Sequence, residues 1–459
     1  PRAADISGKL RLTASKGDYM LKVCKFGGTS MASADTIRKV RDIVFADKSR
    51  RYVVVSAPGK RDKNDVKITD ALYACNEEAL KTGSCKRAFA PIRKRFEEIA
   101  EELGLKLNVS EILDRTEKEI CEKKSADFAA SRGEYLSAII TAEFLGFEFI
   151  DAAEVIRFDS QGRLNQDYTN DKVQVRLAET EHAVIPGFYG KSYNGGIKTF
   201  SRGGSDITGS IIARGVSADV YENWTDVSGF LACDPRIVPE AATIKQITYK
   251  ELRELSYMGA SVLHADAIFP VMKGKIPINI RNTFRPQDEG TMIVPSDKYV
   301  SKEGDSVITG IAGKKDFTVI YIEKSNMNTE VGFVRKVLSV LEHHGVCVEH
   351  LPSGIDTLSV IIPSGQLTGG VLDDVINEIR EAVSPDYVHV IEKISVIATV
   401  GHGMARRPGT AATLFKALSD SGINIKMIDQ GSSELNIIVG VADSDYEKCI
   451  KAIYKAFSS

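Results

Sequence analysis

The sequence predicts an α/β protein in which a mostly parallel sheet, sandwiched by helices, is followed by two small α+β modules. Two observations lead to this fold class. From Met20 to about Thr291, strand-like runs alternate with helical patterns, as in a parallel sheet covered on both faces. The remainder contains an internal repeat, in which each copy reads strand, helix, strand, strand, helix. A chain of 459 residues is long enough for about three domains.

The expected strands of the sheet are short apolar runs separated by helical patterns with charged faces. The strands are Leu21–Phe26, Tyr52–Ser56, Phe147–Ile150, Ala183–Pro186, Asp219–Trp224 and Ile278–Ile280. The helical patterns include Ala34–Ala46, Ala88–Leu103 and Ile207–Arg214. Residues 77–124 are rich in Lys and Glu at helical spacing, which indicates a solvated helical elaboration with no chemistry of its own.

A constant offset reveals the repeat. It relates Val319 to Val396, Met327 to Met404, Gly332 to Gly409, Leu341 to Leu418, Gly345 to Gly422, Gly354 to Gly431 and Leu358 to Leu435. The first copy is expected to contain strands at 317–322, 346–351 and 357–362, and the second at 394–400, 423–428 and 435–441. Each such βαββα unit leaves a sheet edge to cover, so the two copies should pair side by side. By analogy at the level of the fold, they suggest a regulatory region.

Turn formers and charges at 292–305 mark the boundary before this repeat. We therefore expect a catalytic domain at 20–300, a first module at 301–390 and a second module at 391–459. Residues 1–19 have no apolar segment of the kind found in secretory signals. We interpret them as an extension or a cloning remnant.

The composition excludes several classes of protein. The formal net charge is −2, whereas nucleic-acid-binding proteins usually carry a basic excess. No run of about 18 uncharged apolar residues is present, so we expect no membrane-spanning helix. The seven cysteines are scattered and never spaced C-x-x-C. This disfavours a disulfide framework or a zinc site and fits a reducing, cytoplasmic location.

A glycine pair follows the first expected strand, in the run Lys25-Phe26-Gly27-Gly28-Thr29-Ser30. Adjacent glycines let backbone N–H groups approach an anion closely. The lysine just upstream can place a positive charge on transferring phosphate oxygens. The alternative is a plain strand–turn–helix corner, because isolated glycine pairs are common.

A second glycine pair lies in the run Ser201-Arg202-Gly203-Gly204-Ser205-Asp206, just before an expected helix. Arg202 is suited to clamp a carboxylate at two points. Ser205 is expected to cap the helix, and Asp206 could orient Lys25 or hold Mg²⁺ through water. The alternative is a capped helix start beside an accidental arginine.

Further segments also carry candidate residues. The strand-end loop Ser56-Ala57-Pro58-Gly59-Lys60, with Lys67-Ile68-Thr69-Asp70 beyond it, could face the same cleft. Thr225-Asp226 leaves a strand at its carboxyl end, where open α/β sheets bind ligands. Asp234-Pro235-Arg236 is a turn carrying a cation suited to phosphate. Glu134, at the start of an apolar helix, could receive an ammonium group or simply complement the helix dipole.

Metal and nucleotide motifs of other kinds are absent from the sequence. There is no G-x-x-x-x-G-K-[ST] segment. His343 and His344 end an expected helix, where cationic side chains are common, and His350 lies on an expected strand. We therefore expect no protein metal site at these histidines.

Taken together, these segments resemble the aspartate kinase family, whose members have the amino-acid kinase fold. The matching motifs are KFGGTS (25–30), SRGE (131–134), SRGGSD (201–206), WTDVSGF and ACDPR (224–236), MGASVLH (258–264) and IPINIRNTF (276–284). They occur in the family's order, and the repeat resembles its paired ACT domains. Without a further large domain, the chain looks like the monofunctional type.

The resemblance implies transfer of the γ-phosphoryl group of ATP to L-aspartate, giving 4-phospho-L-aspartate and ADP, with Mg²⁺. The attacking carboxylate is already ionised at neutral pH, so positioning and charge neutralisation must supply the catalysis. By resemblance, Lys25 stabilises the moving phosphoryl group and Asp206 organises Lys25. The substrate-binding residues implied are Thr69, Glu134, Ser201 and Arg202. The ATP-binding residues implied are Lys25, Gly27, Gly28, Thr29, Ser30, Thr225, Asp226, Leu231, Asp234, Arg236 and Ser261.

The paired ACT-like modules imply feedback inhibition by an end-product amino acid of lysine, threonine and methionine biosynthesis. The effector-binding residues implied in the first module are Asn326, Met327, Glu330, Gly332, Phe333, Val348, Glu349 and Ser353. Glu330 and Glu349 could hold a lysine ammonium, which favours lysine as the effector; alternatively, both are merely exposed charges. Pairing of modules suggests a homodimer, with a tetramer also plausible.

Two other functions remain open from the sequence. One is a kinase for another carboxylate acceptor, such as glutamate or N-acetylglutamate; Glu134 and Arg202 together favour a free amino acid. The other is a catalytically inactive amino-acid sensor, against which the intact Lys25, Arg202 and Asp206 argue.

Overall fold

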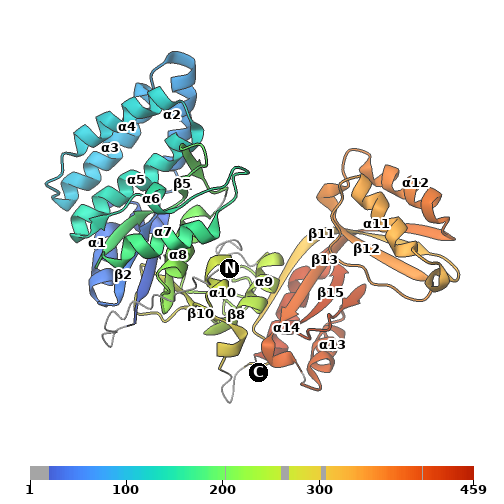
Figure 1. Cartoon of the computed structure of the whole chain (residues 1–459). Coiled ribbons are helices and arrows are strands. Elements are labelled where there is room, and N and C mark those ends of the chain that lie inside the picture. Colours follow the sequence, from blue (N-terminus) through green and yellow to red (C-terminus); the bar gives the residue numbers. More distant parts are fainter. Residues whose placement is uncertain (1–19, 202, 260–267, 301–305, 406, 459) are drawn as a thin grey trace, which may run out of the picture. The chain divides into compact units, whose positions relative to one another are not determined.

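The chain folds into two units, the first built on a parallel sheet and the second mainly on an antiparallel sheet (Figure 1). The computed structural model describes residues 20–201, 203–259, 268–300, 306–405 and 407–458. Within these ranges the first unit comprises residues 20–226 and 268–287, and the second comprises 227–259 and 288–458. Residues 227–259 thus group with the C-terminal unit, whereas we placed all of 20–300 in one domain.

The first unit is built on a parallel sheet. Its strands lie in the order β3-β4-β2-β1-β7-β9, and every neighbouring pair is parallel. The strands are β1 (Lys22–Phe26), β2 (Arg50–Val55), β3 (Glu148–Phe149), β4 (Ala183–Pro186), β7 (Val220–Thr225) and β9 (Ile278–Asn282). A short antiparallel hairpin, β5 (Tyr189–Lys191) and β6 (Ile197–Thr199), stands apart from this sheet. All six expected strands are confirmed.

Helices cover both faces of this sheet. They are α1 (Ala34–Phe45), α2 (Ile68–Thr82), α3 (Lys86–Leu103), α4 (Val109–Lys123), α5 (Ala126–Leu145), α6 (Ala152–Val155), α7 (Gln166–Ala178), α8 (Gly204–Gly215) and α10 (Ile268–Lys273). Cys24, Phe26 and Trp224 share an apolar core with α1 and α5. Strand side chains alternate between faces, so Lys25 and Asn223 project from the other face, toward α8.

The Lys- and Glu-rich segment forms α2, α3 and α4, which pack beside α5 (Figure 1). Their outer faces are charged, as expected. Their inner faces are apolar, and Phe89, Phe96 and Leu113 are almost completely buried in the same core as α1. This elaboration is therefore an integral part of the first unit rather than a wholly solvated addition.

The second unit begins with a parallel pair, β8 (Gln246–Thr248) and β10 (Thr291–Val294), and with α9 (Tyr249–Tyr257). It continues with an antiparallel sheet in the order β12-β11-β13-β15-β14. These strands are β11 (Gly310–Glu323), β12 (Thr357–Pro363), β13 (Tyr387–Val400), β14 (Met427–Asp429) and β15 (Asn436–Ala442). The helices are α11 (Phe333–His343), α12 (Val371–Val383), α13 (Thr410–Asp420) and α14 (Tyr446–Phe457).

The repeat is confirmed, and its two copies lie side by side because β11 pairs with β13 along nearly their whole length. The expected division at 390 differs from the packing, however. Ile308 and Ile311 fall within 301–390, the expected first module, but belong to the core of the second. The N-terminal part of β11 pairs with residues 396–400 of β13. The first module is thus inserted into the second.

The strand expected at 346–351 is mostly absent. In this part of the described chain, His350 forms an isolated bridge to Ile361, and Ser353 forms another to Leu358. Pro352 lies between them and has no N–H to continue the ladder. In the second module, the corresponding strand shortens to β14. No helix in the described ranges is both long enough and apolar enough to span a membrane.

Candidate active site

The centre of the candidate site is the Lys25 ammonium, which projects from β1 into a buried position. The Lys25 side chain is 9% exposed, and its Nζ lies 2.5 Å from Asp206 Oδ1. Nζ also donates to Asn223 Oδ1 at 3.4 Å, and Asn223 Nδ2 donates to Asp206 Oδ1 at 2.9 Å. The three side chains close a triangle that holds the ammonium in one place.

Sequence reasoning missed Asn223. Its position follows from the register, because Asn223 on β7 lies directly beside Lys25 on β1. A signal was available: Glu222 and Asn223 are polar residues in an otherwise apolar central strand. Buried polar side chains in such a strand need partners, and here both find them.

The start of α8 places Asp206 in this triangle. The helix begins at Gly204, and Gly203, with φ 57°, occupies its N-cap without a side-chain cap. The expectation that Ser205 caps the helix is therefore wrong, because Ser205 already lies in the first turn. Asp206 follows in that turn, where the helix dipole favours a negative charge. Its backbone carbonyl accepts a hydrogen bond from Tyr221 Oη at 3.0 Å.

The glycine pair after β1 forms a tight turn. Gly27 N–H donates to the Trp224 carbonyl at 3.0 Å, and Gly28–Met31 form a 3₁₀ turn before α1. Gly59 N–H donates to the Gly28 carbonyl at 2.8 Å. A Cβ on Gly59 would lie 2.6 Å from the Gly28 carbonyl carbon, so only glycine fits there.

Two hydroxyl residues of this turn behave differently. Thr29 is half-buried, whereas Ser30 is completely buried. Ser30 Oγ and Thr283 Oγ1 lie 2.8 Å apart, in hydrogen-bond contact. Ser30 thus ties the turn to the segment after β9.

Glu134 is a buried carboxylate on α5. It is 5% exposed, and burial raises its pKa to about 8, although the Ala57 backbone N–H and Arg132 oppose that rise. Among the described residues, Glu134 Oε2 has no hydrogen-bond partner. A buried carboxylate oxygen without a partner is costly and is suited to receive a cationic ligand.

The loop after β2 connects these two parts of the site. Its Gly59 bonds to Gly28 of the glycine turn, and its Ala57 N–H bonds to Glu134. A Cβ on Gly133 would lie 2.7 Å from Ala57 Cβ, so α5 packs closely against the same loop. The glycine turn after β1 and the buried Glu134 carboxylate therefore both contact one short loop.

The structure gives fewer contacts for two of the other expected substrate-binding residues, Thr69 and Ser201. Thr69 is half-buried in the first turn of α2, next to Ile68, which approaches Gly133. Ser201 is exposed. Arg202 lies outside the described residues.

The expected nucleotide residues are divided between the two units. Thr225 is half-buried at the end of β7 and donates to the exposed Asp226 at 3.2 Å. Leu231, Asp234 and Arg236 belong to the second unit, where Arg236 pairs with Asp234 at 2.6 Å. This contact holds the pKa of Asp234 below its usual range. Ser261 lies outside the described residues.

The expected effector residues fall in two segments, 326–333 at the start of α11 and 348–353 after its end, and not all of them present their side chains to a ligand. Met327 and Phe333 are buried in the core of the first module. Gly332 is the left-handed N-cap of α11. Asn326 and Ser353 are exposed, and Val348 is half-buried.

The two acids of this region differ in their partners. Glu330 pairs with Lys324 at 2.5 Å and with Lys336 at 2.8 Å, and these contacts lower its pKa. Glu349 is half-buried and accepts a hydrogen bond from Tyr257; burial, with this bond, raises the Tyr257 pKa to about 12. Glu330 is thus already neutralised by two cations, whereas Glu349 has a neutral partner.

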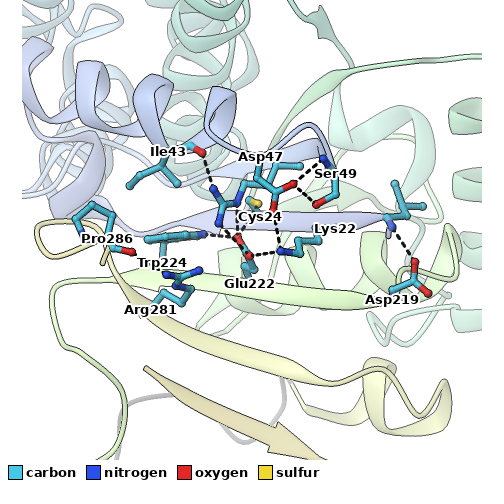
Figure 2. A network of polar contacts seen from close by, with 12 residues as sticks. Lys22, Cys24, Ile43, Asp47, Ser49, Asp219, Glu222, Trp224, Arg281 and Pro286 are labelled. Atoms are coloured by element: carbon cyan, nitrogen blue, oxygen red, sulfur yellow. Dashed lines mark hydrogen bonds and ion pairs between the residues drawn. The ribbon is translucent and has the colours of Figure 1, made fainter. Parts of the chain in front are cut away.

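A second polar network lies on the opposite face of β1 and β7 (Figure 2). Its centre is Glu222, which is 1% exposed. Glu222 pairs with Arg50 at 2.8 Å and Lys22 at 3.3 Å, and accepts from Trp224 Nε1 at 2.9 Å. Although Glu222 is buried, these cations lower its pKa. The network joins β1, β2 and β7 beneath the Lys25 triangle.

Comparisons with known proteins agree with this architecture. Residues 20–282 match the amino acid kinase family, and residues 397–457 match an ACT domain family. Aspartokinase 3 of Bacillus subtilis is 39% identical over 451 residues, which cover 95% of this chain and 98% of that protein.

Solved structures of aspartate kinases also match this chain over almost its whole length. The crystal structure of Clostridium acetobutylicum aspartate kinase is 51% identical with a TM-score of 0.88, covering 95% of this chain and 100% of that chain. E. coli aspartokinase III in complex with aspartate and ADP is 25% identical with a TM-score of 0.71, covering 96% and 100% of the two chains. The chain therefore belongs to the aspartokinase family, and its catalytic part is an amino acid kinase domain.

Proposed function

We propose that this chain transfers the γ-phosphoryl group of ATP to the side-chain carboxylate of L-aspartate, giving 4-phospho-L-aspartate and ADP. The observation that carries this proposal is the loop 57–59, which contacts both the glycine turn beside Lys25 and the buried Glu134. A phosphate at the glycine turn and an amino acid at Glu134 would then lie beside the same loop. The structure solved with aspartate and ADP, that of E. coli aspartokinase III, supports the same pair of ligands.

In this mechanism Lys25 stabilises the charge that moves with the phosphoryl group. The aspartate carboxylate is ionised at neutral pH and needs no general base, so charge neutralisation and alignment supply the rate enhancement. Asp206 and Asn223 position Lys25 before the substrates arrive, which avoids reorganisation during the reaction. Gly27, Gly28 and Thr29 surround the phosphates, and Thr225, Asp226, Leu231, Asp234 and Arg236 serve the nucleotide.

Glu134 receives the ammonium group of aspartate, with Thr69 and Ser201 lining the pocket and Arg202 gripping a carboxylate. Binding would give the partnerless Oε2 of Glu134 a cation and offset the cost of its burial. Asp206 and Asp226 offer carboxylate oxygens of the kind that Mg²⁺ prefers, so the donor set fits that metal. When bound, Mg²⁺ neutralises charge on the phosphate oxygens.

A steady-state assay of ADP release and acyl-hydroxamate formation tests this function with aspartate, glutamate and N-acetylglutamate as acceptors. We expect turnover with aspartate alone. Preference for glutamate or N-acetylglutamate would establish the other kinase, and ADP release that never depends on an acceptor would support an inactive sensor.

We further propose that lysine inhibits the enzyme by binding at the start of α11, and that the ACT modules mediate a homodimer or a tetramer. Glu349, whose partner Tyr257 is neutral, supports an ammonium ligand in this module. Adding lysine, threonine or methionine to the same assay tests the effector. Light scattering of the purified protein measures the oligomer.

A further inference from the structure

The first ACT module carries three side chains that can ligate a metal, on the side where α11 ends. They are His343 and His344, at the end of α11, and Glu378, on α12. One ligating atom from each residue lies within 4.8 Å of the other two. Contrary to our expectation from the sequence for His343 and His344, we propose that these three residues form a binding site for a divalent transition-metal ion such as Zn²⁺, separate from the Mg²⁺ that accompanies ATP.

The distances are close to those of a coordinated metal. His343 Nδ1 lies 3.2 Å from both Glu378 carboxylate oxygens, and His344 Nε2 lies 2.8 Å from Glu378 Oε2. A tetrahedral Zn²⁺ with bonds of about 2.0–2.1 Å holds neighbouring ligand atoms about 3.4 Å apart. An ion can therefore enter the cluster if the side chains move outward by a few tenths of an ångström.

The packing of the two helices fixes the backbone of the site while leaving the ligands accessible. Val337 and Leu341 of α11 and Val375 and Ile379 of α12 share one core, so the helices cannot separate freely. The ligand side chains remain open to solvent, with 72% of His343, 20% of His344 and 36% of Glu378 exposed. Water can supply the fourth ligand.

The electrostatics favour a cation at this end of α11. The last carbonyl groups of a helix carry partial negative charge, and Glu378 adds a full one. Imidazole nitrogen suits zinc, copper and nickel, whereas Mg²⁺ prefers oxygen ligands, so this donor set selects a transition metal.

Coordination requires a lone pair on each ligating nitrogen. Without metal, His343 Nδ1 and His344 Nε2 each face the Glu378 carboxylate. As hydrogen-bond donors to that carboxylate, these two nitrogens carry a hydrogen. When the metal binds, a neutral ring moves that hydrogen to its other nitrogen through solvent, and a protonated ring releases it. Glu378 exchanges its hydrogen bonds from the two imidazole rings for one metal bond.

Zn²⁺ titration of the full-length, EDTA-treated protein against a chromophoric chelator tests the site. Exposed thiols, such as Cys347, are first blocked with iodoacetamide because thiolates also bind zinc. We expect one Zn²⁺ per chain, and a higher melting temperature with Zn²⁺ than without it. His343→Ala, His344→Ala and Glu378→Gln should each weaken binding at least about tenfold and abolish the melting shift. His389→Ala, which removes an exposed histidine on β13 of the same module, is the matched control and should bind like the unaltered chain.

Circular dichroism of each variant shows whether it is folded. The proposal would be overturned if Glu378→Gln and a His343→Ala/His344→Ala double variant both bound Zn²⁺ as strongly as the unaltered chain does. It would also be overturned if the His389→Ala control lost as much Zn²⁺ affinity as the ligand variants. Absence of binding to the unaltered chain at micromolar Zn²⁺ would overturn it as well.

Discussion

The Lys25 ammonium lies 2.5 Å from the Asp206 carboxylate, although β1 and α8 are far apart in the sequence. Both groups are largely buried, and Asn223 bonds to each of them. In such an environment water screens charge weakly, so a fixed ammonium acts strongly on any phosphate that approaches the glycine turn. The following predictions depend on this arrangement and on the groups around it.

Removing the ammonium should abolish most catalysis without unfolding the protein. For Lys25→Ala we expect kcat to fall at least about 10²–10³-fold, because the transferred charge loses its principal protein partner. Steady-state kinetics with ATP and aspartate measure the change, and Lys118→Ala on the outer face of α4 is the control. Near-normal turnover of a folded Lys25→Ala enzyme would remove Lys25 from the mechanism.

Glu134 should make aspartate binding depend on pH. Burial raises its pKa to about 8, so near neutrality the ligand-free carboxyl is largely protonated, whereas a bound ammonium requires it ionised. The KM for aspartate should therefore fall as pH rises toward about 8. In Glu134→Gln this pH dependence should disappear and the KM should be higher throughout. An unchanged pH profile in the variant would exclude Glu134 as the ammonium partner.

The same group should affect stability with a defined sign. Its folded-state pKa lies above the unfolded value of about 4.3, so the folded protein binds the extra proton between about pH 4.3 and 8. Stability relative to Glu134→Gln should consequently decrease as pH rises through that window and level off above it. Melting temperatures of both proteins from pH 5 to 9 check this; an opposite slope would contradict the burial argument.

Gly59 should tolerate no side chain. A Cβ there would lie 2.6 Å from the Gly28 carbonyl carbon and 2.9 Å from the Thr29 nitrogen, so Gly59→Ala must displace the glycine turn. We expect a higher KM for ATP and a lower kcat. Gly365→Ala is the matched control, because that glycine has ordinary φ and open space around it. Equal kinetics for the two variants would show that the turn adapts.

The buried network around Glu222 should stabilise the first unit. Glu222→Gln leaves Arg50 without its buried counter-charge and Lys22 with Asp47 as its remaining partner. Breaking a buried pair typically costs about 3–5 kcal/mol of unfolding free energy. Urea denaturation measures the loss. Asp420→Asn, which breaks an exposed pair with Lys416, should change far less. A loss below about 1 kcal/mol for Glu222→Gln would mean that water compensates the cations.

The two acids near α11 should contribute unequally to inhibition by lysine. Glu349→Gln removes the charge whose partner, Tyr257, is neutral, and should raise the lysine concentration needed for half-inhibition. Glu330→Gln should matter less, since Lys324 and Lys336 already occupy that carboxylate. Dose–response curves of enzyme activity against lysine concentration measure this for both variants. A larger effect from Glu330→Gln would assign the lysine ammonium to Glu330 instead of Glu349.

Short-range patterns were enough to predict the elements. The strands and the glycine turns follow from alternation and turn residues, because these depend on neighbours a few residues apart. The repeat follows from a constant offset between its two copies. The strand expected at 346–351 was mostly wrong, since only His350 of this run forms a bridge, to Ile361, and Pro352 just after it has no N–H to extend the ladder.

The sequence by itself determined the fold class, the family resemblance and the candidates Lys25, Asp206 and Glu134. Only the tertiary structure showed Asn223 between Lys25 and Asp206, the insertion of one ACT module into the other, and Glu378 beside two histidines. Those relationships join residues that are distant along the chain. Register and helix packing set them, and composition or spacing along the chain carries no record of either.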